Sequence, residues 1–175
     1  VMHSIIDACL QLRDEHALRS EQIAAVTVRG DELLLARGDR EVNNARDAQV
    51  SIHHSVAAPL LWGQAGIAEF AEDKVMSEEA IAMRARVRSE LEPGLPNGAC
   101  EVVVATLDGS EHRTTVLHAH GSIEAPLSDA ELETKFRDNA RIGGSGCDVE
   151  AAIGALWELE HASDVSALMQ ALTAR

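Results

Sequence analysis

The residues best suited to chemistry lie together in residues 47–63, which contain a glutamine, two serines and two adjacent histidines. An imidazole titrates near neutral pH, so a histidine here could transfer a proton or pair with a substrate carboxylate. Serine beside histidine also occurs in hydrolases, but the sequence lacks the Gly-x-Ser-x-Gly turn that presents a nucleophilic serine. We therefore expect acid–base or carboxylate-binding chemistry from this segment, and no nucleophilic catalysis by Ser51 or Ser55.

The two histidines, His53 and His54, are predicted to point in different directions. The apolar spacing predicts a helix over residues 48–62 that ends at Gly63, and adjacent helical residues are separated by roughly 100°. Gln49 and His53 then share a flank, while His54 lies on the more apolar side and is directed at the core or at a cleft. The residues leave two interpretations of His54 open, a group that handles protons or carboxylates and a hydrogen-bonded histidine near the end of a helix.

The remaining candidate ligands form no pattern that would hold a metal ion. His3 has no positional pattern of its own, which is typical of a surface histidine. His118 and His120 share one side of a predicted strand, but no third ligand is evident, so polar residues at a strand edge are the favoured interpretation. No zinc-ligand spacing occurs among the cysteines, which we expect to be reduced thiols of a cytosolic protein: Cys9, Cys100 and Cys147.

Periodicity and turn residues predict the elements that position these groups. Helices are expected over residues 4–16, 48–62, 78–84, from 128 onward, 148–161 and 164–173. Strands are expected over residues 23–29, 87–92, 101–107 and 112–119, the last two joined by an Asp108-Gly109 turn, and residues 37–46 are expected to form a loop. We predict a single α+β two-layer domain over residues 1–175, with an antiparallel or mixed sheet of about four strands, helices on one face and further helices at the C-terminus.

Two local signals bracket the first of the C-terminal helices. Ser128 and Glu131 have the spacing of a capping box, in which each side chain satisfies a terminal N–H group. Residues 143–146 are glycine-rich and precede another helix, an arrangement that can hold a phosphate. No lysine follows and Asp148 would repel an anion, so a flexible break between helices is the favoured interpretation.

The charge of the chain excludes several classes of partner. There are 29 acidic and 15 basic residues, for a net charge of −14. We expect no binding to nucleic acid or to an anionic membrane surface, because both require excess positive charge. No apolar run approaches the ~18 residues that a membrane-spanning helix needs, and no signal peptide is expected, so a cytoplasmic protein is predicted. A local cluster of basic side chains could still hold a small anion.

Several segments, taken in order, are similar to the MmgE/PrpD family. Residues 47–63 resemble the family segment Ala-Gln-aromatic-Ser-x-x-(Tyr/His)-x-Val-Ala, with His54 at the position of the Tyr or His. Residues 3–8 and 23–28 resemble the segment after the family's Lys-x-Tyr-Pro-x-Cys signature, with His3 at the histidine that closes it. Residues 66–70, residues 127–136 and the closing helix resemble later blocks, so the resemblance covers nearly the whole chain.

The resemblance implies the smaller, C-terminal lid domain of an enzyme such as 2-methylcitrate dehydratase, cis-aconitate decarboxylase or iminodisuccinate epimerase. Such enzymes act on small di- and tricarboxylates without a metal or organic cofactor, hold the substrate between the lid and a large N-terminal helical domain, and usually form homodimers. By this resemblance His54 and His3 are predicted catalytic residues, and substrate contacts are predicted for His53, Gln49 and Ser51. The isolated chain is expected to be inactive, because several catalytic groups belong to the helical domain.

Two features keep the assignment open. Where many dehydratases have Pro-Tyr this chain has His53-His54, and tyrosine and histidine have different resting pKa values, so dehydration, decarboxylation and epimerisation all remain possible reactions. A helix is expected almost from Val1, which predicts a boundary inside a longer protein. The alternative is a stand-alone binding or dimerisation module of the same fold, without catalysis; an exposed apolar surface would favour the lid.

Overall fold

The computed structural model describes residues 2–173, which form two compact units, one ending at Pro126 and the other beginning at Leu127. The predicted boundary at Val1 concerns a residue outside this range. Among the described residues, no helix is both long enough and apolar enough to cross a membrane.

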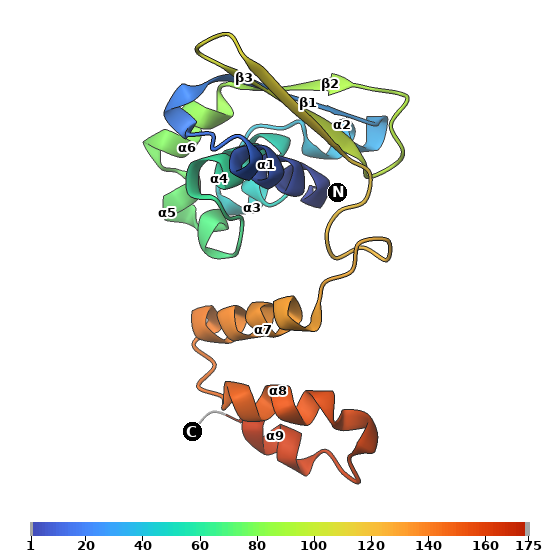
Figure 1. Cartoon of the computed structure of the whole chain (residues 1–175). Coiled ribbons are helices and arrows are strands. Elements are labelled where there is room, and N and C mark those ends of the chain that lie inside the picture. Colours follow the sequence, from blue (N-terminus) through green and yellow to red (C-terminus); the bar gives the residue numbers. More distant parts are fainter. Residues whose placement is uncertain (1, 174–175) are drawn as a thin grey trace. The chain divides into compact units, whose positions relative to one another are not determined.

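The first unit is a four-stranded sheet with helices packed against one face (Figure 1). Its strands follow the order β2-β1-β3-β4 and are β1 (Ile23–Gly30), β2 (Val87–Leu91), β3 (Cys100–Thr106) and β4 (Glu111–Val116). β1 pairs with β2 in parallel and with β3 antiparallel, and β3 and β4 form an antiparallel hairpin whose turn contains Gly109 at a φ of +87°. The sheet is mixed, and the predicted α+β two-layer class is confirmed.

Alternation along β1 decides which face of the sheet the helices cover. Val26 and Val28 are fully buried, whereas Arg29 is only partly buried on the opposite face. There its guanidinium bonds Glu90 of β2 at 3.0 Å and Glu101 of β3 at 2.7 Å. The period of two along the strand therefore gives the sheet one apolar face and one charged face.

Two helices, α1 (His3–Glu15) and α4 (Ile52–Trp62), supply the centre of the layer that covers the apolar face (Figure 1). α1 contributes a stripe that includes Ile5 and Leu12, both with no exposed surface. α4 is apolar and buried on almost every side, as expected for a central helix. It ends at Gly63, whose left-handed φ of +71° is a conformation that residues with a Cβ atom rarely adopt.

Shorter helices complete the unit: η1 (Ser20–Gln22), α2 (Glu32–Gly38), α3 (Ala45–Ala48), η2 (Ala68–Phe70), α5 (Glu72–Val75) and α6 (Glu78–Arg84). The prediction of one helix over residues 48–62 is wrong at its start, because α3 and α4 are separate helices. Ser51 lies between them in extended geometry and is fully buried, so the chain turns there to bring α4 into the core. The expected strand over residues 112–119 ends early, at Val116, and the chain then turns so that the His120 N–H bonds Asp7 of α1 at 2.7 Å.

The second unit consists of α7 (Asp129–Gly143), α8 (Val149–Trp157), η3 (Leu159–His161) and α9 (Ser166–Leu172). The capping box is confirmed, since Ser128 Oγ accepts from the Glu131 N–H at 3.3 Å and Glu131 Oε2 accepts from the Ser128 N–H at 2.8 Å. Gly144 ends α7 at a φ of +59°, so the glycine-rich break acts as a helix cap. Among the described residues, the buried apolar side chains of this unit are Ala152, Ile153 and Ala171.

Candidate active site

The first turns of α4 bring the two histidines into very different surroundings. His54 has no exposed surface, whereas the His53 side chain is 22% exposed. The expected difference in direction is confirmed, because consecutive helical side chains diverge and only one of the two can face the core. The expectation that Gln49 lies on the same helical flank as His53 is wrong, since Gln49 precedes α4.

His54 is held on both sides of its ring. Nε2 lies 2.9 Å from the Glu69 carbonyl oxygen of η2, and Nδ1 lies 3.4 Å from a guanidinium nitrogen of Arg84 in α6. A carbonyl can only accept, so Nε2 carries the proton and Nδ1 accepts from Arg84. The Phe70 ring packs edge-on against the imidazole at a centroid distance of 4.9 Å. This network joins α4, η2 and α6 around one imidazole.

The surroundings of His54 keep its ring neutral. Burial is the main cause that lowers the pKa of His54; the bond to the Glu69 carbonyl opposes this, and the Arg84 charge lowers the pKa further. A neutral imidazole with both nitrogens engaged can exchange a proton with a substrate only when one of these contacts opens. The predicted catalytic role of His54 stays a prediction.

Arg84 is a neighbour of His54 that the sequence analysis did not predict. It is partly buried, and its guanidinium donates to the Val75 carbonyl at 2.6 Å as well as to His54. Burial lowers the pKa of Arg84. The partners lie 9 and 30 residues away along the chain, so no local pattern links them.

His53 forms a second, more open pair. Its Nε2 lies 2.9 Å from Oδ1 of Asp39, at the end of α2, and the Asp39 side chain is 48% exposed. Hydrogen bonds from Ser89 of β2 and then from His53 lower the pKa of Asp39, so the carboxylate is ionised at neutral pH. Asp39 was not among the predicted site residues, because it falls in the segment expected to be a loop.

The other predicted site residues surround α4 to different degrees. Ser51 is buried at the N-terminal end of α4, and its hydroxyl makes a long, 3.5 Å contact with the Arg40 carbonyl. Gln49 is exposed just before it. His3 is exposed in the first turn of α1, and no hydrogen bond or ion pair within residues 2–173 connects it to the histidines of α4. The predicted roles of these three residues stay predictions.

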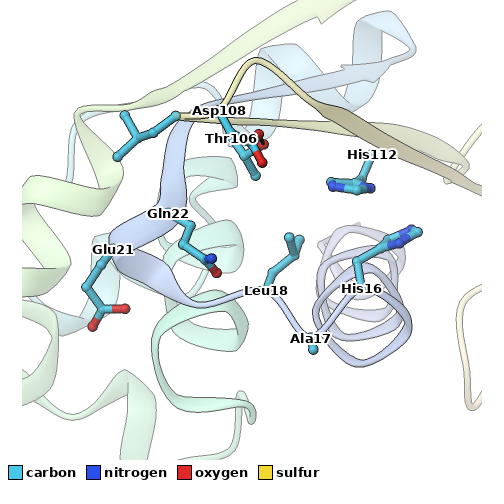
Figure 2. Close-up of a pocket in the computed structure, with 9 residues that line it drawn as sticks. His16, Ala17, Leu18, Glu21, Gln22, Thr106, Asp108 and His112 are labelled. Carbon is cyan, nitrogen blue, oxygen red and sulfur yellow. Dashed lines mark hydrogen bonds between the residues drawn. The ribbon is translucent and has the colours of Figure 1, made fainter.

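A pocket of about 320 Å³ lies elsewhere in the first unit, between the end of α1, η1 and the β3–β4 hairpin (Figure 2). His16 and His112 stack beside it with ring centroids 4.1 Å apart. None of the residues that line it belongs to the predicted site. In the part of the chain that the structure describes, no group of three or more His, Cys, Asp or Glu side chains could hold a metal ion.

Comparison with known families now fixes the relationship that the sequence pattern suggested. The family model for the MmgE/PrpD C-terminal domain matches residues 1–159. The chain belongs to the MmgE/PrpD family. The MmgE/PrpD match includes α4 with both histidines, Asp39 and Arg84, and extends through α7 and α8 of the second unit. A search of curated proteins finds no significant match to this MmgE/PrpD chain.

Proposed function

We propose that this chain is the lid domain of a cofactor-independent lyase or isomerase that acts on small di- or tricarboxylates. The observation that carries the proposal is the match to the C-terminal domain of the MmgE/PrpD family, with a pair of histidines on α4 inside the matched region. On the basis of the sequence resemblance, His54 is proposed to occupy a site position of this family. The match supports a family of dehydratases and isomerases, and the particular reaction is part of the proposal.

The proposed chemistry is removal of a proton next to a carboxylate, followed by loss of water, loss of CO₂ or return of the proton to the opposite face. Such a reaction needs a general base, a general acid and groups that stabilise the negative charge which develops on the carboxylate. His53, His54, Gln49 and Ser51 are proposed as the lid's contribution, with His3 as a further candidate on α1. The remaining groups are proposed to come from the N-terminal helical domain.

The second unit supports the presence of such a helical domain. Its apolar side chains include Trp157, Val165 and Met169, which are 49%, 54% and 57% exposed. Large exposed apolar surfaces on a monomer usually mark a place where another protein surface packs. We propose that α8 and α9 pack against the N-terminal helical domain of the same protein, which favours the lid over a stand-alone binding module. A homodimer and a cytoplasmic location stay predictions.

The proposal is tested by comparing the complete protein, including the sequence upstream of this chain, with the chain alone. Both are incubated with a panel of di- and tricarboxylates, and the products are followed by NMR for loss of water, loss of CO₂ or inversion of a stereocentre. We expect turnover of at least one panel member by the complete protein and none by the chain alone. A folded complete protein that converts no panel member, or a chain that is active by itself, would contradict the proposal.

A further inference from the structure

The two adjacent histidines differ in how freely a substrate can reach them. His54 has no exposed surface, and its two ring nitrogens already contact Glu69 and Arg84. The His53 side chain is partly exposed, and only its Nε2 has a recorded partner within residues 2–173, the Asp39 carboxylate at 2.9 Å. Among the described residues, Nδ1 of His53 is thus the one ring nitrogen of the pair that forms no hydrogen bond or ion pair.

The Asp39 carboxylate fixes which nitrogen of His53 carries the proton. A carboxylate oxygen accepts hydrogen bonds, so neutral His53 is held with its proton on Nε2 and a lone pair on Nδ1. This placement of the His53 proton is inferred from the hydrogen bond to Asp39. A negative charge beside the ring also stabilises the imidazolium that forms when Nδ1 takes up a proton.

Asp39 is itself held in place by its surroundings. It lies at the end of α2, whose last turn packs against the core at Gly38, where a Cβ atom would collide with Ile52 of α4. Ser89 of the edge strand β2 also helps to lower the pKa of the Asp39 carboxyl. The packed end of α2 thus brings one carboxylate to one imidazole of α4, which is the arrangement that a positioned general base requires.

We propose that His53 is the proton-transfer group of the histidine pair and that Asp39 is its positioning residue, an inference that rests on the proposed function. In the step it would perform, a C–H bond next to a substrate carboxylate breaks and the proton moves to Nδ1 of His53. The electron pair of that bond passes into the adjacent carboxylate, and the imidazolium pairs with Asp39. His54 then has a supporting role, in which it ties α4 to η2 and α6.

The pairing is tested first on this chain alone, because it does not depend on turnover. The ¹⁵N shifts of the His53 ring are measured in the unmodified chain, in Asp39→Ala and in Glu41→Gln, which removes a nearby exposed charge as a control. We expect a single neutral tautomer with the proton on Nε2 in the unmodified chain and in Glu41→Gln, and a mixture in Asp39→Ala. A mixture in the unmodified chain, or no change in Asp39→Ala, would overturn the pairing.

The catalytic assignment is tested in the complete protein with the substrate that the polycarboxylate panel identifies. His53→Gln should lower kcat by about a hundredfold or more at nearly constant KM, as expected for loss of a general base. Asp39→Asn should lower kcat by about tenfold, and Asp39→Glu should recover part of that loss; a purely structural role for Asp39 would give no such recovery.

The outcomes separate this inference from the function on which it rests. If His54→Gln abolishes turnover while folded His53→Gln retains it, the lid function stands and the assignment to His53 is overturned. If the unmodified complete protein converts no panel member, the proposed function fails and the catalytic role of His53 fails with it. Circular dichroism of each variant excludes loss of fold as the cause of a lower rate.

Discussion

The two units of the chain differ in how many of their apolar side chains they bury. The first unit closes a core around β1, β3, α1 and α4, and the continuous cluster of buried side chains runs from Met2 to Val116. The second unit exposes large apolar side chains on α8 and α9, and within the described residues only Ala152, Ile153 and Ala171 are buried apolar residues. One unit therefore has an extended core of its own, whereas the other buries few apolar side chains.

The two units also differ in what their polar side chains contact. In the first unit, the polar pair His53–Asp39 lies partly exposed outside the buried core. In the second unit, polar contacts join the helices instead, because Arg137 of α7 bonds Glu150 of α8 at 2.7 Å and the Trp157 N–H bonds Glu133 at 2.9 Å. Such exposed contacts orient helices but stabilise them little.

The largest expected contrast comes from removing one leucine side chain in each unit. Leu12→Ala opens a cavity in the closed core and should lower the free energy of unfolding by about 3 kcal/mol. Leu172, at the end of α9, is 41% exposed, so Leu172→Ala should cost less than about 1 kcal/mol. Urea denaturation of both variants measures the contrast, and equal losses would show that the second unit has a core of its own.

A second contrast compares two hydrogen-bonded arginines. Arg84→Met leaves the Val75 carbonyl and Nδ1 of His54 without their donor inside the protein, which should cost about 2 kcal/mol. Arg137→Met removes two exposed ion pairs from the second unit and should change stability by no more than about 1 kcal/mol. Urea denaturation measures the stability of both variants. A larger loss of stability for Arg137→Met than for Arg84→Met would contradict this prediction.

The pH dependence of stability should come in part from the first unit through His54. The pKa of His54 is lowered in the folded state. Below the ordinary histidine pKa, the unfolded chain therefore binds more protons than the folded chain does. The stability that neutral His54 contributes is complete above that ordinary pKa and is lost as the pH falls through the lowered folded-state pKa. Unfolding measured at pH 7.5 and 5.0 should show a smaller loss in His54→Gln than in the unmodified chain. His161→Gln, which removes an exposed histidine of the second unit, is the control.

The smallest expected effect concerns the turn that follows α1. Ala17 adopts a left-handed φ of +48°, where glycine is favoured, so Ala17→Gly should stabilise the chain by about 0.5–1 kcal/mol. Ala162, after η3 in the second unit, has an ordinary φ of −72°, so Ala162→Gly should destabilise slightly or leave stability unchanged. Thermal unfolding measures both changes. A lower melting temperature for Ala17→Gly would contradict the backbone strain inferred at Ala17.

The sequence predicted those parts of the fold that local patterns determine. The alternation along residues 23–29, the Asp108-Gly109 turn and the Ser128 capping box each carry their own signal within a few residues, and the structure confirms them. The break between α3 and α4 has no such signal. It depends on burial of Ser51 at the start of the central helix, which only the tertiary packing decides.

In the candidate site, too, local features were predictable and long-range contacts were not. Helical periodicity correctly placed His54 toward the core and His53 on the flank, because both directions follow from the sequence position alone. Their partners could not be predicted in this way. Arg84 and Asp39 come from other elements, 30 and 14 residues away, and reach the histidines only once α2, α4 and α6 have packed together.

Hydrogen–deuterium exchange of the chain alone and of the complete protein tests the central claim most directly, namely that this is one part of a two-domain enzyme. In the chain alone we expect slow exchange in β1 and β3 and fast exchange in α8 and α9. In the complete protein, α8 and α9 should exchange at least about tenfold more slowly, because the helical domain covers their apolar side chains. Unchanged exchange in α8 and α9 would contradict the claim.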